Sequence, residues 1–228
     1  MSPSLPWLFL AFSSGAVNTG GLLAGGSYVS HVTGFGTIAG IEIQKAEFSN
    51  VLLILTVPMY FLLGSMLSTL MVDSRTQRSL EPYYHRPLLI SGILIICVAV
   101  GGHIGLIEPF DSTYKPENHY YLLALLCLAS GIENAVVTAA TGGILRSSHL
   151  TGTTTDLGAG LVRASIMKRG SLERQLETRI NLLRTSQIIS FVLGSGLAAF
   201  CFRFDSFLGF LLPAAVTMLS IALSFYKK

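Results

Sequence analysis

The sequence predicts an all-α integral membrane protein with about six transmembrane helices, in two related halves of three helices each. Hydrophobic residues make up 51% of the 228 residues and charged residues only 12%, about half the charged fraction of a soluble domain. Mean hydropathy is +0.62. Uncharged apolar runs long enough to cross a bilayer recur along the chain. A polar motif also occurs twice. The bilayer is therefore the expected solvent of this chain.

The predicted spans are the apolar runs of about 20 residues that a helix needs to cross the hydrocarbon core. They are 7–29, 48–71, 88–107, 120–145, 185–202 and 206–226. The first is interpreted as retained, because no basic segment of a signal peptide precedes it. The polar stretches between spans are 30–47, 72–87, 108–119 and 146–184. Eight spans, with 33–43 and 152–168 also crossing, would weaken the charge bias described next, so six is preferred.

Basic residues are distributed unequally between the two sides that six spans define. Three of them, Lys45, Lys115 and Arg203, fall on one side. The other twelve are Arg75, Arg78, Arg86, Arg146, Arg163, Lys168, Arg169, Arg174, Arg179, Arg184, Lys227 and Lys228. Because Lys and Arg are retained on the cytoplasmic side, the sequence predicts that both termini are cytoplasmic. The net charge is only +3. The basic residues near the membrane ends indicate the orientation of the chain, and they do not indicate nucleic-acid binding.

An internal repeat relates the two halves. SHVTGFGTIAG, beginning at Ser30, returns as SHLTGTTTDLG, beginning at Ser148, with six of eleven residues identical. Further matches lie on both sides of the motif, at offsets of 116 and 130. They pair Ser14-Gly15 and Asn18 with Ser130-Gly131 and Asn134, and Phe61, Leu63, Gly64 and Ser65 with Phe191, Leu193, Gly194 and Ser195. One membrane domain, 1–228, is thus expected to contain three-helix repeats at 1–107 and 120–226.

Three crossings per repeat is an odd number, so the repeats should enter the membrane with opposite polarity. Inverted repeats are frequent in secondary transporters, whose binding sites lie near the midplane between the repeats. Some channels share this architecture.

Each S-H-x-T-G motif is expected to start a half-helix. Thr33-Gly34 and Thr151-Gly152 can end the preceding helix and begin another, because Thr caps free N–H groups and Gly tolerates strained backbone. The segment 33–43 would reach about 16 Å as a helix, half a membrane. Such half-helices either lie at the interface or enter the bilayer and present their positive N-terminal ends to a polar or anionic solute.

The polar residues of the first helix of each repeat lie near the centre of the predicted bilayer. Asn18 is central in 7–29, and Glu133 and Asn134 are central in 120–145. Ionisable groups at this depth are costly and usually face a bundle interior or a water-filled cavity. Glu133 is therefore a hypothetical proton-coupling or cation-coordinating site, flanked by Asn18 and Asn134. The alternative is an interhelical hydrogen bond that holds the bundle together.

His31 and His149 occupy matching positions in the two motifs, and are expected at opposite membrane faces. A histidine can gate protons near neutral pH, or it can simply hold the turn into the half-helix. By the rise per residue, the two histidines and Glu133 lie at different depths, so a shared metal site is not expected. The predicted substrate-binding set is Asn18, His31, Thr33, Gly34, Glu133, Asn134, His149, Thr151 and Gly152.

Other features predict packing or surface contacts. Cys97, Cys127 and Cys201 lie in apolar stretches without metal-ligand spacing, so neither disulfides nor a metal or other cofactor is expected. Glycines spaced by four at Gly21, Gly36 and Gly101 allow close helix approach, within one chain or across a homodimer. The basic stretch 165–184 is expected to be an amphipathic helix on the cytoplasmic surface.

These motifs resemble those of the YoaK-like bacterial membrane proteins, a family of unknown function (domain of unknown function 1275). The resemblance rests on the doubled S-H-x-T-G-x-x-T-x-x-G motif, the preceding Ser-Gly-x-x-Asn and six spans in about 220 residues, and it covers nearly the whole chain. It implies a six-helix fold in a bacterial inner membrane. The family often has Asp where Asn18 stands, so a symmetric mechanism with two acids is not implied for this chain.

Two functions are compatible with this pattern, and a third is not expected. The preferred one is a transporter or exporter of a small polar or anionic solute, for which Glu133 offers a means of proton coupling. The second is a membrane scaffold or sensor partner that does not transport. An intramembrane enzyme is not expected, because the sequence has neither an H-E-x-x-H motif nor a serine–histidine pair on one helix.

Overall fold

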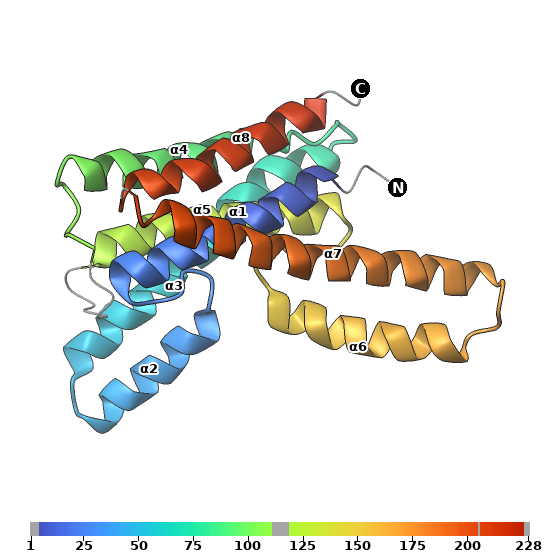
Figure 1. Cartoon of the computed structure of the whole chain (residues 1–228), viewed down its shortest axis with the longest axis horizontal. Coiled ribbons are helices and arrows are strands. Elements are labelled where there is room, and N and C mark those ends of the chain that lie inside the picture. The colour runs from blue at the N-terminus through green and yellow to red at the C-terminus, as the bar shows by residue number, and fades with distance from the viewer. Residues whose placement is uncertain (1–4, 111–118, 205, 226–228) are drawn as a thin grey trace.

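The structure is a computed structural model that describes residues 5–110, 119–204 and 206–225, and every regular element in these ranges is a helix. Figure 1 shows them in chain order. Their bounds are α1 Leu5–Gly25, α2 Val32–Gln44, α3 Phe48–Thr76, α4 His85–His103, α5 Tyr120–Ala140, α6 Leu150–Ile166, α7 Leu172–Cys201, η1 Leu208–Phe210 and α8 Leu211–Phe225. Lys115, Lys227 and Lys228 of the predicted charge asymmetry lie outside the described residues, as does the end of the predicted span 206–226.

Within the described ranges, five helices are long and apolar enough to cross a membrane: α1, α3, α4, α5 and α7. A further apolar helical segment, Leu208–Ser224, is shorter. The helices α2 and α6 have 13 and 17 residues. At the helical rise they reach about 20 and 26 Å, less than the roughly 30 Å of hydrocarbon. The chain is a multi-pass, all-helical membrane protein, and a sixth crossing by Leu208–Ser224 stays a prediction.

The helices α1 and α5 form the centre of the bundle. In each, 67% of the most apolar window is buried, against 17% in α7. The most extensive helix pairs are α3 with α5 and α1 with α7, and α1 also packs on α8 as α5 packs on α4. In Figure 1, α4 and α8 run together along one side, and α2 and α6 lie on the other. The central helices therefore separate a tightly packed α4–α8 side from a side that contains the two short helices.

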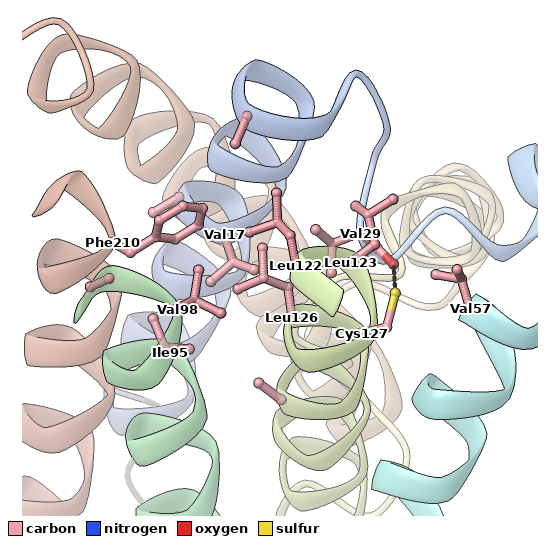
Figure 2. Packing of buried hydrophobic residues seen from close by; sticks show 14 of the residues in the cluster. Val17, Val29, Val57, Ile95, Val98, Leu122, Leu123, Leu126, Cys127 and Phe210 are labelled. Atoms are coloured by element: carbon pink, nitrogen blue, oxygen red, sulfur yellow. Dashed lines mark hydrogen bonds between the residues drawn. The ribbon is translucent and has the colours of Figure 1, made fainter. Parts of the chain in front are cut away.

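A buried apolar cluster joins the central helices to α4 and η1, as Figure 2 shows. Val17 of α1, Ile95 and Val98 of α4, Leu126 of α5 and Phe210 of η1 are each at most 1% exposed. Lipid tails are as apolar as these side chains, so the gain in a bilayer comes from close packing and not from leaving water. This contact layer holds α4 and the α8 region against the central pair.

The loop between α1 and α2 is also tied to α5. Cys127 is buried, and its thiol donates a hydrogen bond to the carbonyl oxygen of Val29 at 2.9 Å (Figure 2). The described cysteines are all free thiols. Cys127 therefore fixes the position of the residues that lead into the first S-H-x-T-G motif.

Glycines bring the backbones of the largest helix pairs into direct contact. A Cβ atom on Gly15 would lie 2.1 Å from the carbonyl oxygen of Phe191, and one on Gly194 would lie 2.0 Å from that of Phe12. The same contacts recur between α3 and α5. There a Cβ atom on Gly131 would lie 2.1 Å from the carbonyl oxygen of Phe61, and one on Gly64 would lie 2.2 Å from that of Leu128.

Of the glycine pairs singled out by their spacing, Gly21 and Gly25 pack closely within the chain, against Val29 and His119 respectively, whereas three glycines of the other two pairs have open space around them. Nothing lies within 4 Å of a Cβ atom placed on Gly36, Gly40 or Gly105. A spacing of four places glycines on one helix face, but it does not say whether that face meets another backbone. The predicted use of these three glycines in packing within the chain was therefore wrong, whereas a homodimer contact through them stays a prediction.

The basic stretch 165–184 does not form a separate surface helix, so that prediction was wrong. Helix α6 ends at Ile166, and α7 begins at Leu172 and runs without a break to Cys201. Ser171 caps α7, because its hydroxyl accepts a hydrogen bond from the backbone N–H of Arg174 at 3.3 Å. The first turns of α7 are therefore a polar extension of a membrane-crossing helix, and they form a hairpin with α6.

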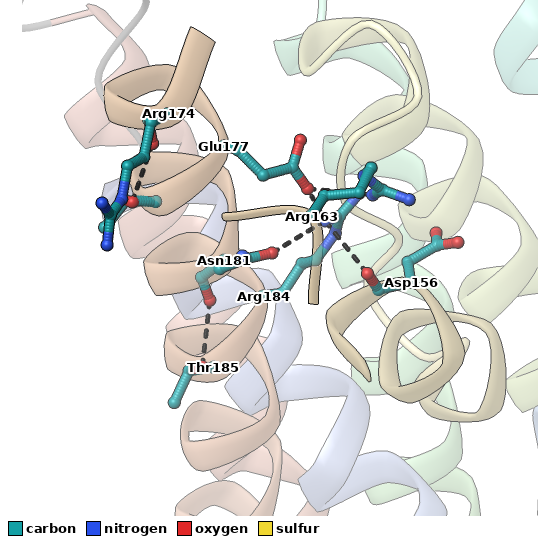
Figure 3. A network of polar contacts seen from close by, with 8 residues as sticks. Asp156, Arg163, Arg174, Glu177, Asn181, Arg184 and Thr185 are labelled. Carbon is teal, nitrogen blue, oxygen red and sulfur yellow. Dashed lines mark hydrogen bonds and ion pairs between the residues drawn. The ribbon is translucent and has the colours of Figure 1, made fainter. Parts of the chain in front are cut away.

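Figure 3 shows the polar network that holds this hairpin together. Glu177 on α7 accepts from Arg163 on α6 at 2.9 Å and from Arg184 at 3.4 Å. The same Arg184 donates to Asn181 Oδ1 at 3.0 Å and to the carbonyl oxygen of Asp156 at 3.2 Å. Arg163 is thus engaged within the chain.

Candidate functional site

The two S-H-x-T-G motifs have the same backbone geometry. His31 precedes the first residue of α2 with φ −93° and ψ 67°, and His149 precedes α6 with φ −88° and ψ 67°. The predicted threonine caps are wrong, because each histidine occupies the N-cap position and Thr33 and Thr151 lie in the first turn. Both short helices therefore begin directly at the histidine.

The glycine of each motif makes room for the histidine ring. A Cβ atom on Gly34 would lie 2.6 Å from Nδ1 of His31, and one on Gly152 would lie 2.6 Å from the ring of His149. Each ring therefore folds back over the first turn of its own helix. The physical reason for the His-x-x-Gly spacing is close packing of the ring on the backbone.

An asparagine from a central helix holds each motif in place. The carbonyl oxygen Oδ1 of Asn18 accepts from the backbone N–H of Ser30 at 3.1 Å, and Nδ2 donates to Ser30 Oγ at 2.7 Å and to the carbonyl oxygen of Ser14 at 3.1 Å. Asn134 Oδ1 accepts from the backbone N–H of Ser148 at 3.4 Å. The asparagine and the serine of each half are therefore one structural unit.

A cavity of about 700 Å³ lies between the two motifs. It collects six of the nine predicted site residues: Asn18, His31, Thr33, Asn134, His149 and Thr151. Gly34 and Gly152 lie next to it in the first turns of α2 and α6. The expectation that His31 and His149 lie at opposite membrane faces was wrong, because both line this one cavity. The depth of each histidine was estimated from the helical rise per residue, which assumes that the chain continues outward after the first helix of each repeat. In the structure, each short helix instead begins at the cavity.

Equivalent residues of the two halves line the cavity in pairs. These are Asn18 with Asn134, Ser30 with Ser148, His31 with His149, Val32 with Leu150, Thr33 with Thr151, and Phe61 with Phe191. Phe61, Phe191 and Ser195 were not predicted as site residues, although all three belong to the repeated segments. Thr19, Leu22 and Tyr28 complete the lining, and they carried no signal in the sequence.

The cavity has a mostly apolar surface with polar groups at defined positions, and its electrostatics favour negative charge. No Asp, Glu, Lys or Arg occurs among the lining residues that the structure describes. The first turns of α2 and α6 contribute Val32, Thr33, Leu150 and Thr151, and the free N–H groups of a helix start carry a partial positive charge. The positive N-terminal ends of α2 and α6 therefore face a space whose described lining contains no carboxylate, which favours the binding of a negative group.

The second histidine has a defined hydrogen-bonding role. Arg146 Nη1 lies 3.1 Å from His149 Nδ1. A guanidinium group can only donate a hydrogen bond, so Nδ1 of His149 is the acceptor. The proton of the neutral ring is then on Nε2, which can donate a hydrogen bond to another group. Arg146 thus orients the imidazole and adds positive charge behind it.

Glu133 does not lie at the cavity and makes no described contact with Asn18. It is 1% exposed and faces α4 and α8. One oxygen of its carboxyl group accepts from Thr217 Oγ1 at 2.7 Å and from Ser91 Oγ at 3.0 Å. Ser13 of α1 joins this cluster through a 2.9 Å hydrogen bond with Thr217. Neighbouring residues on a helix point about 100° apart, so Glu133 and Asn134 lie on different faces of α5.

In the described part of the chain, no group of three or more His, Cys, Asp or Glu side chains is arranged to hold a metal ion. The side chains brought together at the cavity are hydroxyl, carboxamide and imidazole groups. These groups can bind a polar solute by hydrogen bonds.

Comparison with known proteins identifies the family. The family described as "Protein of unknown function (DUF1275)" matches residues 7–224. No curated protein and no solved structure matches the chain. The match covers both S-H-x-T-G motifs and all the helices that line the cavity, so it includes the whole candidate site. As the resemblance implied, the chain belongs to the DUF1275 (YoaK-like) family.

Proposed function

We propose that this protein is a transporter or exporter of a small polar or anionic solute, built from two inverted three-helix repeats in the bacterial inner membrane with both termini in the cytoplasm. The observation that carries the proposal is the cavity of about 700 Å³ whose lining consists largely of equivalent residue pairs from the two halves. Binding sites of transporters with inverted repeats lie at the interface of the repeats.

The way in which helices of one half pack on helices of the other supports the proposed repeat. Helix α1 packs on α7, and its equivalent α5 packs on α3. Ser195 Oγ donates to the carbonyl oxygen of Gly15 at 3.1 Å, and its equivalent Ser65 Oγ donates to that of Gly131 at 3.2 Å. Each crossing interface therefore contains one helix from each half, so that a relative movement of the halves would change the cavity between them.

The two short helices support a polar or anionic solute. Half-helices whose N-termini point at a central site bind anionic groups of substrates in several transporter folds. Here both helix starts, two imidazoles and the hydroxyls of Thr33 and Thr151 surround the space. A single carboxylate or a neutral polar group would be matched by these donors.

Glu133 is proposed as the proton-coupling residue, on a different face of α5 from the one that lines the cavity. Its carboxyl group is held between α1, α4, α5 and α8 by the hydroxyls of Ser91 and Thr217. Helices α1 and α8 contain no titratable side chain in the described residues. Helix α4 carries His85, Arg86, Cys97 and His103, and α5 carries Tyr120, Tyr121 and Cys127. A change in its charge would act directly on the packing of these helices.

A membrane scaffold is the second candidate, and the α6–α7 hairpin favours it. Leu161, Val162 and Ile166 of α6 are 57%, 60% and 77% exposed, and a partner protein or lipid would cover them. A scaffold would keep its activity when the cavity is filled, so the following experiment also separates the two functions.

Filling the cavity is expected to abolish uptake. The purified protein is reconstituted into liposomes and tested for uptake of a panel of small carboxylates, amino acids and neutral polar metabolites, with and without a pH gradient. For a solute that is taken up, Thr151→Trp should lower the initial rate about tenfold or more, because each 1.4 kcal/mol of lost binding is a factor of ten. Thr151 lines the cavity.

The matched control is Thr154→Trp, which places the same side chain on α6 at an exposed position outside the lining. Its uptake rate should stay within about twofold of the unmodified protein. No uptake of any solute in the panel, or equal rates for the two variants, would contradict the transport function.

A further inference from the structure

A second cavity, of about 450 Å³, lies between α3 and α5 beside the α3–α4 loop. Ser65, Thr69, Asp73 and Thr76 line it from α3. Their spacing of four, four and three residues places them on one face of the helix, so a polar stripe faces α5 over nearly three turns. A polar stripe within a membrane-crossing helix is costly against lipid and indicates a water-accessible groove.

Asn134 connects this groove to the central cavity. Of the residues that the structure describes, it is the one that lines both spaces. Thr138, one turn further along α5, lines the groove and donates to the carbonyl oxygen of Asn134 at 2.7 Å. The carboxamide of Asn134 therefore lies where a solute would pass from one space to the other.

Two residues that correspond to groove residues through the repeat line the central cavity instead. Ser195 and Thr19 are the equivalents of Ser65 and Ala135 at the repeat offsets of 130 and 116. Ser195 and Thr19 line the central cavity, whereas Ser65 and Ala135 line the separate groove. The central cavity thus includes residues of the α1–α7 interface, whereas their counterparts at the α3–α5 interface line a separate groove.

The two asparagines differ in how firmly they are held. Asn18 makes three hydrogen bonds, two of them to Ser30. Asn134 Oδ1 accepts one described hydrogen bond, from Ser148 at 3.4 Å, a length at the weak end of the range. Of the two equivalent side chains, Asn134 is the one that can move at small energetic cost.

We propose that the groove between α3 and α5 is the passage from the central cavity to the face that bears Arg75, Arg78 and Arg86, and that Asn134 is its gate. This inference rests on the transport function proposed above and assigns a route to it. A solute would leave the cavity by displacing the Asn134 carboxamide and would then follow the hydroxyls of Ser65, Thr69 and Thr138.

The groove also narrows the class of solute. Asp73 lines it together with Tyr84 of the α3–α4 loop. Burial, and secondly the charge of Asp73, raise the pKa of the Tyr84 phenol, so Tyr84 keeps its proton and acts as a hydrogen-bond donor. A carboxylate beside the passage repels multiply charged anions. A neutral or zwitterionic polar solute fits both the groove and the cavity.

The first part of the test asks whether the groove is open to water. Cys97, Cys127 and Cys201 are replaced by serine, and single cysteines are introduced on α3 at Thr69 and, for comparison, at Leu70. Thr69 lines the groove, whereas the adjacent Leu70 is 68% exposed outside it. A charged, membrane-impermeant methanethiosulfonate, added from the side that bears Arg75, should label Thr69→Cys and leave Leu70→Cys unmodified. Equal labelling of the two would overturn the passage.

The second part tests the gate. Thr151→Cys reports on the central cavity, and the reagent is again added from the Arg75 side. A gate that opens in a minor state, populated at 0.1–10%, limits the rate of labelling, so Asn134→Ala should increase the rate about tenfold or more. Asn134→Ser, a smaller change, should give an intermediate increase. Asn50→Ala, at an asparagine of α3 that lines neither space, should leave the rate unchanged.

The outcomes separate this inference from the transport function, because labelling requires no transported solute. Equal effects of Asn134→Ala and Asn50→Ala, or no effect of either Asn134 variant, would overturn the gate. If the Thr151→Trp variant abolishes uptake but the labelling pattern fails, the protein transports by another route. If the labelling pattern holds and no solute is taken up, the groove and gate stand and the transport function fails.

Discussion

Adding one methyl group at Gly194 is expected to lower the thermal stability of the purified protein by about 5 °C or more. The Cβ atom would lie 2.0 Å from the backbone carbonyl oxygen of Phe12, so α1 and α7 would have to move apart along their whole contact. Overpacking of this kind costs about 1–3 kcal/mol, and each kcal/mol corresponds to roughly 2–4 °C in a chain of this size. The midpoint of thermal unfolding in detergent is the measurement.

Gly196→Ala is the matched control on the same helix. Nothing lies within 4 Å of a Cβ atom at Gly196, and alanine is about 1 kcal/mol better than glycine in a helix, so the midpoint should stay or rise. Gly64→Ala should repeat the loss, because its Cβ atom would lie 2.2 Å from the carbonyl oxygen of Leu128. Equal midpoints for Gly194→Ala and Gly196→Ala would show that α1 and α7 do not pack in this way.

Replacing Glu133 with glutamine is expected to remove the response of uptake to a pH gradient. The amide has the shape of the carboxyl group and can still accept from Ser91 and Thr217, but it cannot take up or release a proton. Uptake of the transported solute into liposomes, with and without an inward proton gradient, is the measurement. The unmodified protein should respond to the gradient, whereas Glu133→Gln should give one rate in both conditions.

Two further variants make this result specific. Glu133→Asp restores an ionisable carboxyl group one methylene shorter, and it should recover part of the response. Glu47→Gln removes an exposed carboxylate in the turn between α2 and α3, and it should behave like the unmodified protein. A gradient response that survives in Glu133→Gln would assign this carboxyl group to holding α4 and α8 in place, as an interhelical hydrogen bond does.

Most of the candidate site could be predicted from the sequence, because the chain contains the relevant motif twice. The repetition of His31, Thr33 and Asn18 at matching positions identified residues with a shared role, without any knowledge of where the chain turns. The depth of the histidines could not be obtained in the same way. A count of residues assumes that the chain advances steadily through the bilayer, whereas here it turns back to the asparagine of the preceding helix before each short helix begins.

The hydrogen-bond partners of Glu133 could not be predicted from the sequence either. The sequence places Glu133 next to Asn134, and the two were expected to act together. In a helix, adjacent side chains point in different directions, and only the packing of α4 and α8 decided that Ser91 and Thr217 would surround the carboxyl group. These three residues lie far apart in the chain, and a serine or threonine in a membrane helix gives no signal of its own.

The sequence by itself determined that this protein is a multi-pass helical membrane protein, because the composition and the apolar runs leave no other solvent for its surface. It also determined which residues recur in the two halves. Only the tertiary structure decided that α1 packs on α7 and α5 on α3, which brings both motifs to one cavity and leaves Glu133 outside its lining. The reason is that these contacts depend on glycines whose backbones meet another backbone, and glycine spacing alone does not reveal which helix it will meet.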